Sequence, residues 1–179
     1  MTTLENDIIK LRPLEPEDID ILYQWENETS IWKVSHTIAP FSKYIIKKFI
    51  ENSHLDIYET KQYRFIIDLK NKTGIEAIGT IDLFDFDPYH NRIGLGILIK
   101  EDKHKQKGYA SIALELLINY VFNTLLVHQL YCNICPNNKA SLALFQKHGF
   151  TIIGLKKEWL KTSAGYEDEY MLQLVNPYQ

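Results

Sequence analysis

A short polar stretch, Lys105-Gln106-Lys107-Gly108-Tyr109-Ala110, constrains this sequence most, because it separates two apolar segments of different periodicity. Residues 92–99 before it alternate like a strand, and residues 111–122 after it are apolar at helical spacing. A strand, a glycine loop and a helix in this order direct backbone N–H groups and the positive end of the helix dipole to one point. With lysines on either side, the stretch predicts a phosphate-binding loop, and an ordinary strand-to-helix turn is the alternative.

Length and composition favour one domain covering residues 1–179. The chain has 179 residues, of which 45% are hydrophobic and 24% are charged, as in an ordinary globular enzyme. The net charge of −3, without a basic stripe, argues against a nucleic acid partner. No apolar run is long enough to cross a bilayer, and the acidic start is unlike a secretory signal. We therefore expect a cytoplasmic protein without a membrane partner.

The metal-ligating residue types show no pattern that favours a metal centre. Cys132 and Cys135 form a single C-x-x-C pair inside an apolar, strand-like segment, and no second pair of ligands accompanies them. We interpret both as reduced structural thiols. The six histidines are scattered without ligand spacing, so no metal is expected.

Periodicity and turn signals predict a mixed α/β chain in the order β-α-α-β-β-β-α-β-α-β-β. Segment 25–40 has no clean period and is interpreted as a loop with room for a helical turn. Gly94 and Gly96 share one face of their strand, which indicates either a bulge or a close neighbour. Residues 76–86 are expected to alternate strictly between two faces. The expected strands are 8–14, 63–69, 76–86, 92–99, 125–134, 151–159 and 166–175, and the expected helices begin near Pro16, Ser42, Ser111 and Lys139.

Three parts of the chain together resemble the GNAT N-acetyltransferase superfamily, and the resemblance covers almost the whole chain. Residues 105–110 match the family's Q/R-x-x-G-x-G/A acyl-CoA pyrophosphate loop. Residues 138–141 and 145–150 match its N-x-x-[SA] and K-x-G-F segments, and 10–18 are typical of the ribosomal-protein and polyamine acetyltransferase branches. The chain is most similar to the spermidine/diamine N-acetyltransferase-like group. The resemblance implies a single-domain fold with a mixed, mostly antiparallel sheet of six to seven strands, a central V-shaped splay and four flanking helices.

The sequence departs from the family pattern at two positions. Lys105 stands where Gln or Arg is usual, and lysine can still offer charge to a phosphate. Phe145 stands where the family often has a tyrosine that protonates the leaving thiolate. Because a thiol pKa is about 8.5, the thiolate can leave without a strong acid, so whether an acid takes part is open. If one is needed, Tyr109, Tyr131 and Tyr170 remain open as candidates.

The resemblance implies that acetyl-CoA is the acetyl donor. Its diphosphate would be held by backbone N–H groups of the 105–110 loop, and its pantetheine arm by exposed strand backbone next to the splay. Asn138 would bind the arm or an ordered water, or cap the following helix, and the two roles can coexist. The expected donor-binding residues are Ile97, Leu98, Ile99, Lys105, Gln106, Lys107, Gly108, Tyr109, Ala110 and Asn138.

The acceptor amine must lose a proton before it can attack, and a carboxylate is expected to take it. No acid lies between residues 92 and 99, so Asp82 and Asp85 on the preceding strand are the candidate bases, unless they are solvated or paired with Arg92. Acids and aromatics suit a cationic amine. Expected acceptor-binding residues are Glu26, Glu28, Trp32 and Glu158, with a solvated hairpin and core tryptophans as the alternative.

The predicted activity is acetyl transfer from acetyl-CoA to a primary amine of a small polyamine or diamine, by direct attack in a ternary complex. Acetylation of a protein N-terminus, such as that of a ribosomal protein, is an alternative. An alternative of another class is a non-catalytic acyl-CoA-binding or sensory domain, which Phe145 would suit. The resemblance also implies a homodimer or higher homo-oligomer.

Overall fold

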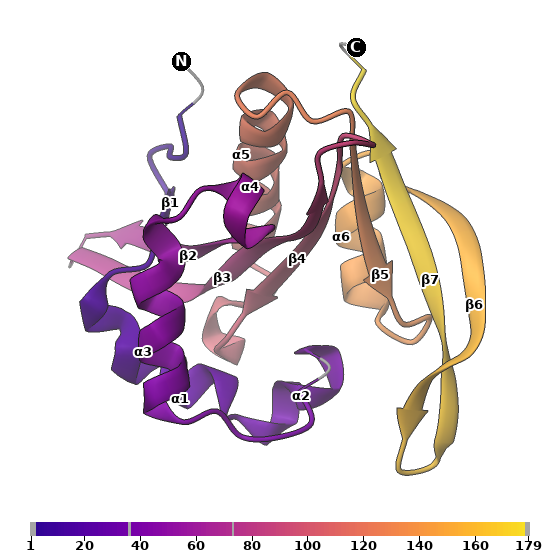
Figure 1. Cartoon of the computed structure of the whole chain (residues 1–179), viewed down its shortest axis with the longest axis horizontal. Helices are drawn as coiled ribbons and strands as arrows, with labels where there is room; N and C mark the ends of the chain where they lie inside the picture. The colour runs from indigo at the N-terminus through magenta and orange to yellow at the C-terminus, as the bar shows by residue number, and fades with distance from the viewer. Residues whose placement is uncertain (1–2, 36, 73, 178–179) are drawn as a thin grey trace.

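Seven strands form one sheet in the order β1-β2-β3-β4-β5-β7-β6, and helices cover both of its faces (Figure 1). The computed structural model describes residues 3–35, 37–72 and 74–177. The strands are β1 (Ile9–Arg12), β2 (Tyr63–Asn71), β3 (Gly74–Asp87), β4 (Arg92–Ile99), β5 (Gln129–Ile134), β6 (Thr151–Thr162) and β7 (Gly165–Val175). The helices are α1 (Ile19–Glu26), α2 (Thr29–Ser35), α3 (Lys43–Glu51), α4 (Ile57–Thr60), α5 (Tyr109–Asn123) and α6 (Lys139–Lys147).

One parallel pair interrupts the otherwise antiparallel sheet. β4 pairs with β5 only from Arg92 opposite Gln129 to Gly94 opposite Tyr131. Beyond Gly94, β4 stays on β3 while β5 stays on β7, so the two strands part as Figure 1 shows. This confirms the expected V-shaped splay, which divides the sheet into two arms.

Two apolar clusters hold the helices to opposite faces of the sheet. α5 is buried along Ala113, Leu114, Leu117 and Val121 and packs on β1 to β5. Leu22 of α1 and Ile46 and Ile50 of α3 pack with Ile66 of β2 on the other face. α5 is the longest described helix, with 15 residues. None of the described helices is long and apolar enough to be a membrane span.

Local signals place several element ends where the sequence predicts them. The Ser42 side chain accepts from Ile45 N at 3.2 Å at the start of α3, and the Asn138 side chain accepts from Ser141 N at 3.2 Å at the start of α6. Gly149 has a φ of 86°, a conformation that favours glycine directly after a helix. Both expected helix starts are therefore confirmed, and Gly149 follows the end of α6.

The number of helices differs from the prediction. The described residues form six α-helices instead of four, because α2 lies in the segment interpreted as a loop and the short α4 precedes β2. α2 has only seven residues, and α4 is a single turn capped by Asp56. Helices this short carry too few apolar positions for a periodic signal. β5 also begins later than expected, at Gln129.

Two irregularities in β3 make the predicted strict alternation of residues 76–86 wrong. The register with β2 shifts between Ile67 and Asp68, so Ile78 joins the same apolar cluster as Ile81. A second shift lies between Phe84 and Asp87 in the register with β4, where Asp85 has a φ of 51°. β4 itself pairs regularly from 94 to 99. The glycine pattern therefore indicates a close neighbour: a Cβ at Gly94 would lie 2.3 Å from the Phe84 ring.

Candidate active site

The parting of β4 and β5 opens a cleft of about 960 Å³ that reaches from α6 across the sheet to α1 and α3. The β4 wall is apolar, the α6 wall carries small polar side chains, and the β2–β3 wall carries charge. Its lining is formed by Leu22, Glu26, Ile31, Phe41, Ile45, Ile46, Phe49, Gln62, Tyr63, Arg64, Thr80, Asp82, Leu83, Phe84, Leu95, Gly96, Ile97, Leu98, Cys132, Asn133, Ile134, Cys135, Asn137, Asn138, Ser141, Phe145 and Glu169.

The β4 wall presents backbone as well as side chains. β3 bonds one edge of β4 from residue 94 to 99, whereas β5 pairs with the other edge only as far as Gly94. Ile97 and Leu98 therefore line the cleft beside a strand edge without a described strand partner. An extended chain bearing amides can add to such an edge. Ile99, also expected there, is buried and does not line the cleft.

The 105–110 loop lies where β4 ends and α5 begins. Gln106 and Gly108 have φ values of 60° and 84°, and Gly108 forms the N-cap of α5. Lys105 N donates to Asp102 O, and Ile112 N donates to Gly108 O. Among the described residues, the backbone amides of 106–111 have no backbone acceptor. A Cβ at Gly108 would meet no atom within 4 Å. Free amides around open space at a helix start fit a diphosphate.

α6 borders the cleft with residues one turn apart. Ser141 and Phe145 line it from the same face of the helix, and Asn138 lines it at the cap. Phe145 is 3% exposed and packs edge-on against Phe150 at 5.0 Å. Phe145 offers no proton, and Tyr109, Tyr131 and Tyr170 are not among the described lining residues.

Two acids and one arginine form an ion cluster on the β2–β3 wall. Arg64 Nε donates to Asp82 Oδ1 at 2.6 Å, and Arg64 Nη1 donates to Glu26 Oε1. The guanidinium also lies over the Phe49 ring, 5.4 Å from its centroid. Burial raises the pKa of the Asp82 carboxyl above its ordinary value, and the charge of Arg64 opposes that rise. The cluster carries one net negative charge when all three groups are ionised.

Asp85 is placed differently from Asp82. It is exposed, sits in the β3 bulge and does not line the cleft. Burial raises the pKa of Tyr131 on β5, and the nearby Asp85 carboxylate adds to that rise. Arg92, considered as a partner for these acids, pairs with Asp87 instead, at 3.1 Å.

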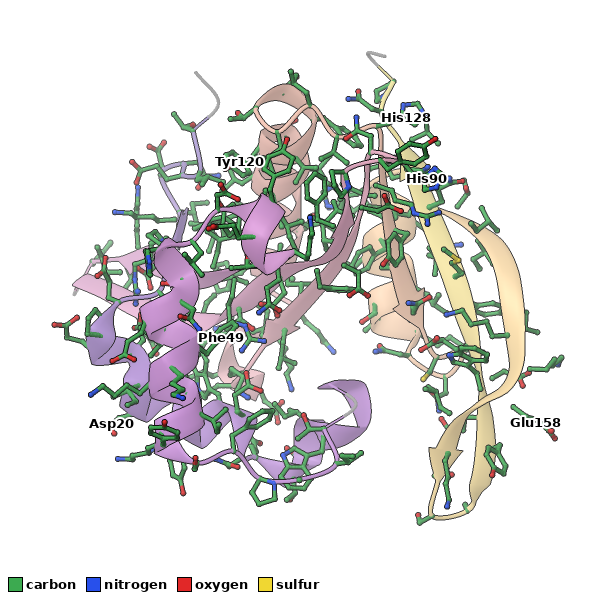
Figure 2. The ribbon with its side chains drawn as sticks, viewed as in Figure 1. Asp20, Phe49, His90, Tyr120, His128 and Glu158 are labelled. Atoms are coloured by element: carbon green, nitrogen blue, oxygen red, sulfur yellow. The ribbon has the colours of Figure 1, made fainter. Side chains whose placement is uncertain are left out.

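Of the four expected acceptor-binding residues, only Glu26 lines the cleft. Trp32 Nε1 donates to the Glu26 carbonyl at 2.9 Å and so supports that turn. The Glu28 carboxylate lies 3.9 Å from Lys100 Nζ. Glu158 has a φ of 48° in an irregular part of β6, and Figure 2 shows its side chain directed outward from the β6–β7 hairpin.

A second ion cluster lies on the opposite arm and was not anticipated from the sequence. Lys156 Nζ donates to Glu169 Oε2 and to Asn133 Oδ1, both at 2.8 Å, and lies 5.2 Å from the centroid of the Trp159 ring. Glu169 and Asn133 line the cleft, and Glu169 is 3% exposed. Arg64 was missed. The available signal was a charged residue inside an apolar strand pattern, which is rarely buried unless it is paired.

Neither Cys132 nor Cys135 forms a disulfide, and both line the cleft from the β5 side. Burial raises the pKa of Cys132 to about 12, so it remains a thiol at neutral pH. No group of three or more His, Cys, Asp and Glu side chains among the described residues is arranged to hold a metal ion.

Comparisons with known proteins agree with this geometry. A family model described as an acetyltransferase (GNAT) domain matches residues 9–151. The spermidine N(1)-acetyltransferase of Escherichia coli is 26% identical over 146 residues, which cover 82% of this chain and 74% of that protein. An uncharacterised N-acetyltransferase of Bacillus licheniformis is 29% identical over 176 residues, which cover 98% of this chain and 97% of that protein.

A solved structure shares the fold at lower identity. The spermidine N-acetyltransferase of Vibrio cholerae in complex with CoA and spermine superposes with a TM-score of 0.83 at 20% identity, covering 96% of this chain and 97% of that one. The family match, spanning most of the chain, together with the splayed sheet and the loop at the start of α5, settles the family. This chain belongs to the GNAT family and is an acyl-CoA-dependent N-acetyltransferase.

Proposed function

We propose that the protein transfers an acetyl group from acetyl-CoA to a primary amine of a small diamine or polyamine, by direct attack in a ternary complex. The observation that carries the proposal is the cluster of Glu26, Arg64 and Asp82 in the cleft, which has one net negative charge. A partly buried negative wall attracts a cationic acceptor. Relatives named for spermidine acetylation support the same acceptor class.

The donor and the acceptor would bind to different parts of the molecule around the cleft. The amides of residues 105–110 would hold the diphosphate, the free edge of β4 at Ile97 and Leu98 would hold the pantetheine amides, and Asn138 would contact the arm from α6. The bound thioester supplies the acetyl group. The acceptor approaches from the α1 and α3 side, where the carboxylates lie.

Asp82 is the proposed proton acceptor. A lysine-like amine has a pKa near 10.4, so only about one molecule in a few thousand is neutral at pH 7. Asp82 lines the cleft and is half-buried, and its raised pKa makes it a better base than an ordinary carboxylate. Arg64 keeps the carboxylate ionised and oriented, while Glu26 remains close to the amine's path.

The experiment is an assay of free thiol release with purified protein, acetyl-CoA and a panel of amines, with mass spectrometry of the product. We expect acetylated diamines or polyamines and little reaction with a peptide that has a free N-terminus. Preferential acetylation of the peptide would overturn the acceptor assignment. Tight acetyl-CoA binding without thiol release from any amine would instead support a binding or sensory domain.

We also infer that the chain forms a homo-oligomer. β6 is an edge strand that is exposed along most of its length and carries Ile153 and Leu155 at 51% and 41% exposure. Exposed apolar edge strands in stable proteins are usually covered. Light scattering after gel filtration tests this: the wild type should be oligomeric, and Ile153→Lys with Leu155→Lys should lower the mass. A monomeric wild type would contradict it.

A further inference from the structure

His104 is a buried histidine at the base of the proposed donor loop 105–110. It is the last residue of the short helical turn η3 (Asp102–His104), which lies between β4 and the loop, and it is 6% exposed. The centroid of its ring lies 6.2 Å from that of Tyr109, the first residue of α5. The ring therefore connects the residue before the loop with the residue at which the loop runs into α5.

The Nε2 atom of His104 is tied to the sheet. It lies 3.1 Å from Glu76 Oε1 on β3, and Lys103 Nζ lies 2.8 Å from the same oxygen. Hydrogen bonds from Lys103 and His104 lower the pKa of Glu76, so this carboxyl group is ionised at neutral pH. An ionised carboxylate can only accept, so Nε2 carries the ring proton and donates it. In the neutral ring the other nitrogen, Nδ1, is then an acceptor.

The Nδ1 atom of His104 is buried and has no hydrogen-bond partner among the described residues. A buried acceptor without a partner costs free energy, and native proteins contain few of them. Nδ1 is bonded to Cγ, so it lies at the end of the ring nearer the backbone. The backbone amides of 106–111 are donors without a backbone acceptor among the described residues. An unpaired acceptor thus directly precedes a run of unpaired donors.

We propose that His104 is a positioning residue of the donor loop, in which Nε2 anchors the ring to β3 and Nδ1 accepts a hydrogen bond from the loop when CoA is bound. The diphosphate takes some of the loop amides, and ordering of the loop around it brings a remaining amide to Nδ1. The new hydrogen bond stabilises the CoA-bound loop, although His104 does not touch CoA. This rests on the proposed donor-binding role of residues 105–110.

Two amide side chains separate the roles of the two ring nitrogens. His104→Asn can place an acceptor near the position of Nδ1 but is too short to reach Glu76. His104→Gln can still donate to Glu76 but has no polar atom at the position of Nδ1. We expect His104→Gln to bind CoA about tenfold more weakly than the wild type, because one hydrogen bond of the bound state is lost. His104→Asn should bind CoA more tightly than His104→Gln.

Calorimetric titration with CoA measures these affinities, and urea unfolding shows that each variant is folded. Weaker binding by His104→Asn than by His104→Gln would assign the role to the Glu76 contact alone and overturn the proposal. Equal affinities of the two variants would overturn it as well. His54→Gln is the matched control: His54 is exposed, and its Nδ1 already lies 2.5 Å from the Glu51 carbonyl oxygen, so CoA affinity should not change.

A measurement on the wild type keeps the proposal testable if the variants do not fold. In NMR spectra of the histidine ring nitrogens, addition of CoA should shift the Nδ1 resonance of His104 toward that of a hydrogen-bonded acceptor. The Nε2 resonance should stay that of a protonated nitrogen. An Nδ1 resonance that does not move when CoA is bound would overturn the proposal.

Failure of this proposal differs from failure of the proposed donor site. If Gly108→Trp weakens CoA binding but the His104 variants bind CoA as the wild type does, the loop holds the diphosphate without help from His104. If Gly108→Trp leaves CoA binding unchanged, the loop assignment itself is wrong, and the role of His104 fails with it.

Discussion

At the scale of single residues, Arg64 lowers the net negative charge of the two cleft acids that it contacts. It is one cation shared by carboxylates from two elements, Glu26 of α1 and Asp82 of β3. An unpaired buried carboxylate would take up a proton, and the shared guanidinium opposes this. The proposed base is therefore the product of a contact between residues far apart in the sequence.

Asp82→Asn is expected to lower kcat by about 10²- to 10⁴-fold, the range for loss of a general base. Because burial raises the pKa of Asp82 and the base must be ionised, the wild-type rate should fall as pH falls through that raised pKa. Steady-state kinetics across pH measure both effects. Asp85→Asn is the matched control on the same strand, and a larger loss there than at Asp82 would move the role to Asp85.

Gly108→Trp is expected to weaken CoA binding about 100-fold, because several charge-assisted hydrogen bonds to the diphosphate would be lost. The new side chain would fill open space at the loop, and the φ of 84° adds strain. Gly74→Trp is the control, since Gly74 also has a positive φ and open space but lies in the β2–β3 turn. Calorimetry with CoA measures affinity, and equal affinity in both variants would contradict the loop assignment.

At the scale of elements, the N-cap residue of α6 combines a structural role with a proposed binding role. Asn138 caps the helix through its side-chain oxygen, and the same residue lines the cleft. The cap explains why a polar side chain stands at this helix start, and the proposed contact with the pantetheine arm would explain why that side chain is an amide.

Asn138→Ala is expected to lower the free energy of unfolding by about 1 kcal/mol through loss of the cap and to weaken CoA binding. Asn138→Ser should keep most of the stability, because serine also caps, but should lose the amide contact with the arm. Urea unfolding and CoA titration distinguish the two roles. If Asn138→Ser binds CoA as the wild type does, Asn138 is a cap only.

At the scale of the whole molecule, the buried cation Lys100 connects the end of β4 to the end of α1. Lys100 follows β4, its side chain is 2% exposed, and Nζ donates to the Trp25 carbonyl near the end of α1 at 2.8 Å. Burial lowers the pKa of Lys100 to about 8. The contact holds α1 and the following turn against the sheet, beside the cleft.

The lowered pKa of Lys100 predicts that the free energy of unfolding depends on pH. The ordinary pKa is 10.5, so between pH 8 and that value the unfolded chain binds more protons than the folded chain, and the free energy of unfolding should rise with pH. Relative to Lys100→Met, the wild type should gain about 3 kcal/mol across this range. Urea unfolding at several pH values measures the difference, and parallel curves for the two proteins would contradict the predicted burial effect.

Much of the fold could be predicted because its signals are local. The Ser42 and Asn138 caps, the Gly149 stop and the strand 92–99 depend on neighbouring residues, and the structure confirms each of them. The short helix α2 and the β3 bulges escaped prediction. Seven residues hold too little periodic signal, and a bulge is set by the partner strand's register.

The proposed donor site could be predicted from the sequence, because the loop 105–110 and the start of α6 are continuous segments whose chemistry is local. The proposed acceptor site could not be predicted in this way. Glu26, Arg64 and Asp82 come from three elements, and Lys156 and Glu169 from two strands that meet across a hairpin. Whether a carboxylate can pair with a substrate depends on which cations of the protein lie within ion-pair distance of it. Those distances are set by the tertiary structure.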